Sequence, residues 1–125
     1  MHGNLLEVSG LRVEFHTRTG NVQAVRDVSF ELSNGEVFAL VGESGCGKST
    51  TALSIIRLVP VPGRITGGSI LFEGKNLLSL AESTMMQYRG KEIGMIFQNP
   101  LVALNPVYRT GFQVQEAVML DNVTR

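Results

Sequence analysis

The sequence predicts an α/β fold, and three patterns along the chain carry this prediction. Residues 11–15 and 28–32 alternate apolar with polar side chains, as half-buried strands do. Residues 37–41 form an unbroken apolar run, which favours a parallel strand buried on both faces. A glycine-rich stretch comes next, and the residues after it can form a helix as far as Leu58. Strands joined by such a helix are typical of an α/β domain.

The first two strands are predicted to pair with each other in antiparallel fashion. Their connection, at about residues 17–21, is polar and contains Gly20. Asn34 and Gly35 form a strong turn signal that separates this pair from the apolar run. The apolar positions of the two strands are Leu11, Val13, Phe15, Val28, Phe30 and Leu32.

Beyond the apolar run, the pattern predicts a largely buried helix that ends at Pro60 and Pro62. Three glycines at positions 63, 67 and 68 indicate a loop, followed by a short strand at 69–73 and a turn at 73–76. Ser79 and Glu82 have the spacing of a capping box, which predicts a short helix to about Arg89.

The last third of the chain contains a second apolar run, at residues 93–97, which we expect to be another strand. Gln98 stands at its C-terminal end. Two Asn-Pro pairs then bound a loop, and Thr110 begins a last helix with an apolar stripe. Because such a stripe needs a surface to pack on, we expect the sequence to be the front part of a larger domain.

The composition is that of a globular protein with a packed core. Hydrophobic residues make up 43% and charged residues 18% of the 125 positions. Eleven basic residues balance eleven acidic ones, so charge gives no reason to expect a nucleic-acid partner. No apolar run reaches the length of a membrane span, and the single cysteine, Cys46, has no internal disulfide partner.

Residues 42–50 form the pattern of a phosphate-binding loop, called the phosphate loop below. The apolar run before it and the predicted helix after it supply the strand–turn–helix context that this motif needs, so the pattern predicts a P-loop NTPase core. Backbone N–H groups at the start of the helix would face an anion. Lys48 would reach the β- and γ-phosphates, and the Ser49 hydroxyl would bind Mg²⁺. The loop comprises Gly42, Glu43, Ser44, Gly45, Cys46, Gly47, Lys48, Ser49 and Thr50.

Gln98 is the second candidate site residue. Ligands of open α/β sheets bind at the carboxyl ends of the strands, and Gln98 follows the second apolar run as the phosphate loop follows the first. Its amide could bind Mg²⁺ through oxygen and orient a water through its N–H groups. The alternative interpretation, that Gln98 merely ends a strand, is equally compatible with its position.

Together, these segments resemble the ATP-binding subunit of an ABC transporter, of the dipeptide, oligopeptide and nickel importer group. The segments are residues 40–50, the Ile-Leu-Phe-Glu-Gly stretch at 70–74, the Met-Ile-Phe-Gln-Asn-Pro stretch at 95–100 and Leu-Asn-Pro at 104–106. The resemblance implies an ABC-type core with an N-terminal antiparallel β subdomain. It places this subdomain and the P-loop core at residues 1 to about 109, and the start of a helical subdomain at 110–125.

The resemblance also implies roles for single residues. Gln98 would be the glutamine that senses the γ-phosphate and Mg²⁺ and acts with Lys48 in catalysis. Phe15 falls where the family stacks an aromatic ring on adenine, with His16 as the fallback. Phe15 also continues the apolar alternation of its strand, so core packing is the competing interpretation.

The implied function is to couple ATP binding and hydrolysis to uptake of peptides or a related small solute, nickel included. The implied partners are transmembrane permease subunits, a second ATP-binding subunit in a homo- or heterodimer and, indirectly, an extracytoplasmic substrate-binding protein. The implied location is the cytoplasmic face of the inner membrane, as a peripheral subunit.

The sequence departs from the family pattern in what it lacks. It contains no signature motif, no Walker B aspartate with a catalytic glutamate and no switch histidine, because His2 and His16 stand too early in the chain. We therefore expect these 125 residues alone to have negligible turnover, although the full subunit would be an ATP hydrolase. The alternatives are an ABC-type ATPase without a transporter, a P-loop kinase or GTPase, and a nucleotide-binding fragment that does not hydrolyse.

Overall fold

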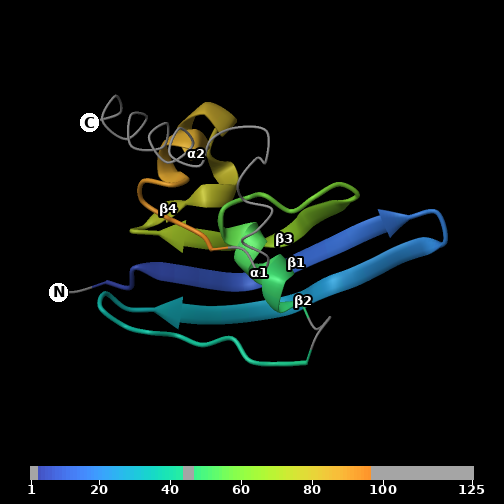
Figure 1. Cartoon of the computed structure of the whole chain (residues 1–125), viewed down its shortest axis with the longest axis horizontal. Helices are drawn as coiled ribbons and strands as arrows, with labels where there is room; N and C mark the ends of the chain where they lie inside the picture. The colour runs from blue at the N-terminus through green and yellow to red at the C-terminus, as the bar shows by residue number, and fades with distance from the viewer. Residues whose placement is uncertain (1–2, 44–46, 97–125) are drawn as a thin grey trace, which may run out of the picture. The chain divides into compact units, whose positions relative to one another are not determined.

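The structure is a computed structural model that describes residues 3–43 and 47–96 (Figure 1). The chain divides into two compact units, Met1–Ala81 and Glu82–Arg125. Several predicted features lie outside the described residues: Phe97, Gln98, the loop with its two Asn-Pro pairs and the helix from Thr110. Three residues of the phosphate loop, Ser44, Gly45 and Cys46, also lie outside them.

The first unit is built on a four-stranded antiparallel sheet. Its strands are β1 (Leu6–Thr17), β2 (Gly20–Leu32), β3 (Gly63–Phe72) and β4 (Lys75–Asn76), in the order β2-β1-β3-β4. The predicted antiparallel pairing of the first two strands is confirmed, with Thr17 opposite Gly20 across the connection. β1 is the central strand of the long part of the sheet, because it pairs with β2 on one side and β3 on the other.

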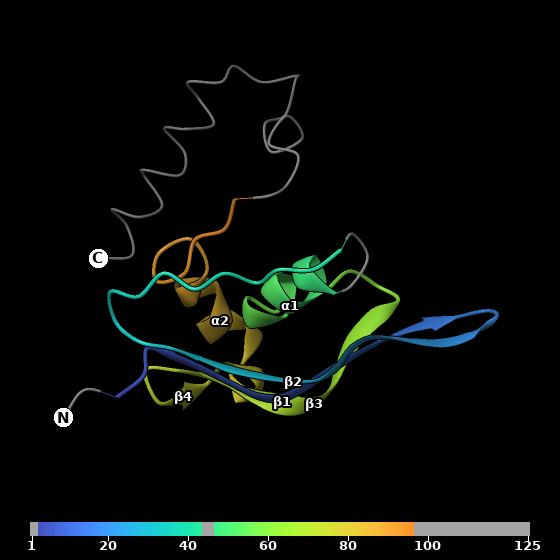
Figure 2. The same ribbon diagram turned by 90° about the horizontal axis from the view of Figure 1, so that it is seen from below.

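The core of this unit lies on one face of the sheet, beneath the helix α1 (Lys48–Ile55) (Figure 2). Val8, Leu11 and Val13 of β1 are at most 1% exposed, and Ile70 of β3 is fully buried. Leu11 and Val13 follow the period-two alternation of a strand, and the extra residue of β1 between Ser9 and Arg12 brings Val8 to the same face.

The predicted loop at residues 63–68 is wrong, because these residues belong to β3. Glycine is compatible with this strand because β1 comes close to it. A Cβ atom on Gly68 would lie 2.5 Å from the carbonyl oxygen of Gly10, and Gly68 has a positive φ of 96°. The register shifts at this point, with one extra residue in β1 between Ser9 and Arg12. The glycines therefore mark a β-bulge and a close backbone approach, which is their other role in sheets.

A second bulge lies in β2, at Arg26 and Asp27. Leu11 pairs with Val28 and Val13 pairs with Val25, so β2 has one residue more than β1 over this interval. Asp27 adopts a left-handed conformation with φ of 53°. Such a bulge changes the direction of the side chains next to it.

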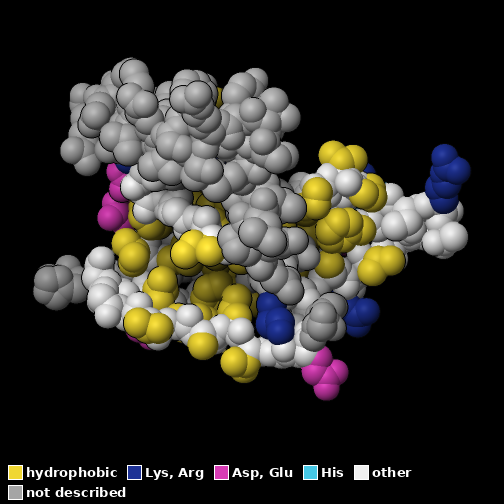
Figure 3. Space-filling model, viewed as in Figure 1, with side chains coloured by type: hydrophobic (Ala, Val, Ile, Leu, Met, Phe, Trp, Pro, Cys, Tyr) yellow, Lys and Arg dark blue, Asp and Glu magenta, His cyan; other side chains and the backbone are white. Residues whose placement is uncertain are grey.

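The predicted buried strand at residues 37–41 is wrong in this structure. The turn at Asn34 and Gly35 is present, but the following segment is extended without strand pairing and runs alongside β2, on the side of the sheet that carries α1 (Figures 1 and 2). Val37 is 97% exposed and Val41 is 89% exposed. A strand buried on both faces needs hydrogen-bonding neighbours and covering layers, and the described residues supply neither. Hydrophobic side chains consequently reach the surface along this part of the molecule (Figure 3).

One contact does tie this segment to the sheet. The rings of Phe30, in β2, and Phe38 stack with centroids 5.0 Å apart and an angle of 15° between their planes. Phe38 is accordingly less exposed, at 43%, than the valines on either side of it. The segment therefore has an inner side that meets β2 and an outer side that is open.

The helix after the phosphate loop forms as predicted, but it is shorter and its buried positions differ. It ends at Ile55 rather than Leu58, which is 44% exposed. Its own most buried side chains are the hydroxyl residues Thr51 and Ser54, whose oxygens donate to the carbonyls four residues earlier at 2.8 and 2.7 Å. These bonds satisfy the hydroxyls locally, so they can be buried at little cost.

After β3, the predicted turn is confirmed, with Phe72 opposite Lys75 and Glu73 and Gly74 both at positive φ. The capping box is wrong. Ser79 lies in a short 3-10 helix, η1 (Leu77–Ser79), and its hydroxyl donates to the carbonyl of Asn76 at 2.9 Å. The side chain is therefore already used when the next helix begins.

The second unit contains the predicted short helix, α2 (Glu82–Tyr88), with Met85 fully buried. Glu82 instead forms an ion pair with Arg89, at 2.5 Å between Oε1 and Nη1. The predicted strand from residue 93 does not form over 93–96: Ile93 makes one isolated bridge to Arg89, and Ile96 is 92% exposed. As with residues 37–41, the described chain provides no neighbouring strand here.

Candidate functional site

The N-terminal end of α1 carries the described part of the phosphate loop. Gly47 is the residue that caps this end, in a left-handed conformation with φ of 94°. A Cβ atom on it would lie 2.5 Å from the carbonyl oxygen of Ala24 in β2. Only glycine fits both the backbone angle and the space, so the loop is seated directly on the sheet.

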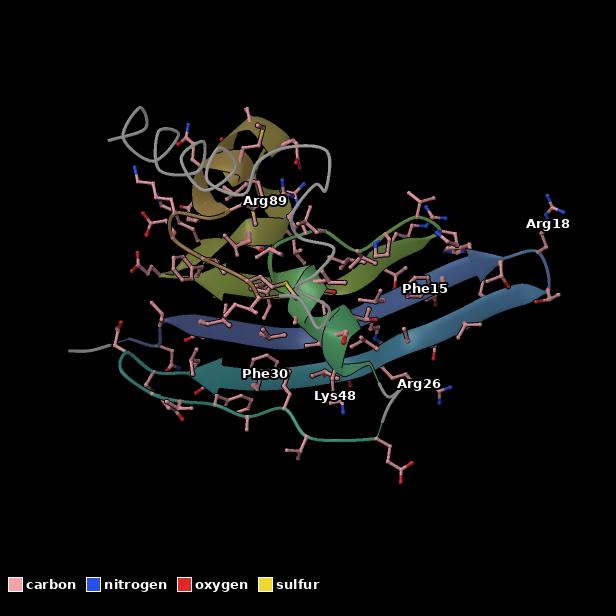
Figure 4. All side chains as sticks on the ribbon, in the orientation of Figure 1. Phe15, Arg18, Arg26, Phe30, Lys48 and Arg89 are labelled. Carbon is pink, nitrogen blue, oxygen red and sulfur yellow. The ribbon has the colours of Figure 1, made fainter. Side chains whose placement is uncertain are left out.

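Lys48 is the first residue of α1, and its ammonium group stays at the loop. Its Nζ donates a hydrogen bond to the carbonyl of Gly42, at the other end of the loop. The two ends of the phosphate loop are thus linked by the residue predicted to bind phosphate. Figure 4 shows Lys48 at the end of α1, with Arg26 near it.

The first turn of α1 is arranged for an anion. The capping residue Gly47 gives its N–H groups no side-chain hydrogen bond, and the turn itself contains no acidic residue. Uncapped N–H groups at a helix start carry partial positive charge and attract phosphate. Ser49 is exposed on this turn, and Gly42 and Glu43 are exposed at the other end of the loop.

A hollow of about 470 Å³ lies beside this turn, called the β2–α1 hollow below. Its lining consists of Thr51 from α1 and a run of β2 residues: Val22, Gln23, Ala24, Val25, Arg26 and Val28. The wall is therefore mostly one strand, reached from the phosphate loop through Gly47 and Ala24. None of the β2 residues that line it belongs to the predicted site, because a strand wall has no motif of its own.

Arg26 is the one cationic side chain in this lining. The bulge at Arg26 and Asp27 explains the position of Arg26. Asp27 lies over Gly10, since a Cβ atom on Gly10 would be 3.3 Å from Oδ1 of Asp27. Arg26, the residue before it, borders the hollow. Among the described residues, the Arg26 guanidinium has no hydrogen-bond or ion-pair partner. The signal that could have found it is the extra residue between Val25 and Val28, which interrupts the alternation.

Phe15 stands next to the hollow, since it pairs across the strands with Val22. Its ring packs over Gly63, where a Cβ atom would lie 2.7 Å from the ring edge and 2.7 Å from Val59. The packing that competes with adenine stacking is thus present, and the stacking role stays a prediction. Figure 4 places Phe15 on β1, beyond α1 from Lys48.

His16, the alternative to Phe15, is held by its backbone, which donates to the carbonyl of Pro62 at 3.1 Å. Its Nε2 lies 3.7 Å from Oε2 of Glu14, and within the described chain this buried nitrogen has no hydrogen-bond partner. Like Phe15, His16 is not among the residues that line the β2–α1 hollow.

The described part of the chain comprises residues 3–43 and 47–96. That part of the chain holds no group of three or more His, Cys, Asp or Glu side chains able to bind a metal ion. It also has no helix long and apolar enough to cross a membrane.

Three comparisons agree on what the chain is similar to. A family model described as "ABC transporter" matches residues 25–123. The oligopeptide transport ATP-binding protein OppD of Bacillus subtilis is 52% identical over 115 residues, which are 91% of this chain and 32% of that protein. The dipeptide transport ATP-binding protein DppD of the same organism is 51% identical over 116 residues, or 92% of this chain and 35% of that protein.

A solved structure has the same fold. It is a dimeric bacterial ABC transporter cassette, with a TM-score of 0.80 at 21% identity over 93% of this chain and 47% of that one. The predicted fold class is confirmed by this match. The present chain spans about a third of the length of the curated relatives it matches.

Proposed function

Because the chain belongs to the ABC transporter family, we propose that it is part of the ATP-binding subunit of a peptide importer. In this proposal the subunit binds Mg·ATP at the phosphate loop and couples its hydrolysis to uptake of a peptide or a related small solute. The single observation that carries the binding step is the uncapped start of α1, with Gly47 seated on β2 and Lys48 reaching across the loop.

The chemistry of the site fits this ligand. Lys48 would exchange its bond to Gly42 for the β- and γ-phosphate oxygens, and the first N–H groups of α1 would donate to the same anion. The Ser49 hydroxyl and Gln98 would hold Mg²⁺, which when bound neutralises phosphate charge. The remaining loop residues, Glu43 to Gly45 and Cys46, would contribute backbone N–H groups, and Thr50 would extend the first helical turn.

We place the base beside the β2–α1 hollow. Phe15 is our candidate for the stacking ring, because its cross-strand partner Val22 lines that hollow. Arg26, in the same lining, would add a second positive charge near the nucleotide. The two residues thus divide the tasks of recognising an aromatic base and an anionic tail.

The domain assignment and partners follow from the same family membership. We propose that residues 1 to about 109 are the β subdomain and P-loop core, and that residues 110–125 begin a helical subdomain. The partners would be permease subunits in the membrane and a second ATP-binding subunit, with the protein lying peripherally on the cytoplasmic face. The names of the relatives, which are peptide transport ATP-binding proteins, support a peptide as cargo.

The test is calorimetric titration of the chain with Mg·ATP. We expect saturable binding that Lys48→Ala weakens by about tenfold or more, since hydrogen bonds to charged groups contribute about 1.5–3 kcal/mol. Lys75→Ala is the matched control, because Lys75 is an exposed lysine in β4. Equal affinity of the wild type and Lys48→Ala would reject the phosphate loop as the binding site.

Two further measurements separate the alternatives. Weak competition by GTP against ATP would count against a GTPase. Co-purification of the full-length subunit with membrane permease subunits would distinguish an importer from an ABC-type ATPase without a transporter. A single-turnover assay on this chain should show binding without hydrolysis.

A further inference from the structure

The helix that carries the phosphate loop ends in an unusual way. Leu58 N–H donates to the carbonyl of Leu53 at 2.9 Å, and Arg57 N–H donates to that of Ser54 at 3.1 Å. These two bonds define a Schellman ending, whose left-handed residue is usually glycine. Here that residue is Arg57, with φ of 57°.

An arginine in this conformation is strained relative to glycine, because its Cβ crowds the backbone. The Arg57 side chain makes two hydrogen bonds. Nη1 of Arg57 donates to the carbonyl of Leu80 at 2.6 Å and to that of Leu77 at 3.2 Å. Hydrogen bonds from a charged donor are stronger than neutral ones, so they can offset the strain.

The two carbonyls belong to Leu77, the first residue of η1, and to Leu80, the residue after it. Leu77 is fully buried and Leu80 N–H donates only weakly, at 3.4 Å, to the Leu77 carbonyl. A single 3-10 turn leaves most of its C-terminal carbonyls without backbone partners. The Arg57 guanidinium therefore acts as the cap of this turn, although it comes from a helix 20 residues earlier in the sequence.

The helix α1 connects Arg57 to the phosphate loop. Lys48 is the first residue of α1 and Arg57 follows its last turn, so the two stand at opposite ends of one eight-residue helix. A helix of that length is about 12 Å long and moves as a stiff element. We therefore expect a displacement of the N-terminal end of α1 to reach the guanidinium at the other end.

We propose that Arg57 is a positioning residue that couples occupancy of the phosphate loop to the turn at residues 77–80. This proposal rests on the proposed binding of ATP. Nucleotide binding shifts or stiffens α1, and Arg57 transmits that change to the carbonyls of Leu77 and Leu80. The turn comes directly before α2 in the chain. A change in the turn on nucleotide binding would therefore affect the start of α2.

Hydrogen exchange of the whole chain, followed by mass spectrometry of peptides that cover residues 77–80, tests the coupling. In the wild type, we expect saturating Mg·ATP to slow exchange there by about fivefold or more, the low end of measured couplings between sites. Arg57→Gly is the informative variant, since glycine suits the left-handed backbone and removes the cap. It should bind ATP within about twofold of the wild type, yet show no exchange response to it.

The comparison separates coupling from simple support. If Arg57 only stabilised the turn, Arg57→Gly would speed exchange equally with and without ATP and the response would persist, which would overturn the proposal. Arg57→Lys keeps one charged donor and should retain part of the response. Arg64→Gly, which removes an exposed arginine from β3, should respond like the wild type.

The outcome for ATP itself keeps the two proposals apart. Wild-type chain that binds ATP without any change at residues 77–80 rejects the coupling and leaves the binding function intact. Wild-type chain that binds no ATP in the calorimeter rejects both. A response confined to variants that keep a cation at position 57 supports the coupling.

Discussion

The carbonyl oxygen of Ala24 occupies the space that a side chain on Gly47 would need, at 2.5 Å from the position of its Cβ atom. This relationship fixes the phosphate loop on β2 without any side-chain contact. It also means that the geometry of the loop depends on the strand that lines the β2–α1 hollow.

The Gly47 contact predicts that Gly47→Ala is both destabilising and defective in binding. The new methyl group must displace β2 or the loop, and alanine is strained at φ of 94°, so we expect a loss of about 2 kcal/mol or more. Urea unfolding measures the loss, and titration with ATP should show no saturation at concentrations that saturate the wild type. Gly94→Ala is the control, because that position is open and has no positive φ. Equal unfolding midpoints for the two variants would contradict this packing.

Arg26 predicts a charge effect on nucleotide affinity. Removing one cation beside a triphosphate should lower the affinity for ATP by about threefold to tenfold. The affinity for adenosine, which has no phosphate, should fall much less. Arg26→Gln is compared with Arg18→Gln, which removes the same charge at the distant tip of the β1–β2 hairpin (Figure 4). The difference between the two should shrink as salt is raised. If both variants bind ATP equally well, Arg26 has no place in the site.

Phe15 can be assigned to stacking or to packing with two substitutions. Phe15→Leu keeps an apolar side chain over Gly63 and Val59 but removes the aromatic face, whereas Phe15→Tyr keeps the ring. Base stacking contributes about 1–3 kcal/mol, so Phe15→Leu should lower the affinity for ATP by roughly tenfold. The affinity of Phe15→Tyr should stay near that of the wild type. The thermal midpoint of each variant checks that the fold is retained. Unchanged affinity in Phe15→Leu would leave only the packing role, and His16→Ala would then be measured in its place.

Cys46 offers a probe of the loop because it is the one cysteine of the chain. Thiols next to a helix start are prone to react as thiolates, and a phosphate held by the loop would cover this position. We expect iodoacetamide to label the chain and saturating Mg·ATP to slow labelling by about fivefold or more. Mg·AMP, which lacks the β- and γ-phosphates, serves as the comparison. Identical labelling rates with and without ATP would show that Cys46 does not lie in the binding loop.

The sequence predicted those elements whose partners lie close along the chain. The β1–β2 hairpin follows from the alternation at Leu11, Val13 and Phe15, and the helix start follows from the glycine-lysine pair at 47 and 48. Periodicity indicates which face of a strand is buried, but it does not reveal whether a neighbouring strand is present. Residues 37–41 therefore have the composition of a central strand and the exposure of a loop.

Other features escaped prediction because one residue type has two uses. The sequence pattern predicts a loop at Gly67 and Gly68, whereas in the structure they allow β1 to approach β3 closely. The bulge that places Arg26 at the hollow depends on one extra residue, which a pattern of average periodicity does not register. Arg57 has no sequence signal at all, since its left-handed backbone is stabilised by carbonyls 20 residues away or more.

The open valines at 37 and 41 have a practical consequence for work in solution. An extended segment with unpaired backbone and apolar side chains is a template for edge-to-edge association between copies. The phosphate loop begins at Gly42, immediately after this segment, so association would obstruct the entrance for nucleotide. Apparent affinity for ATP should then fall as protein concentration rises, and ATP would act as a solubilising agent that keeps the chain monomeric.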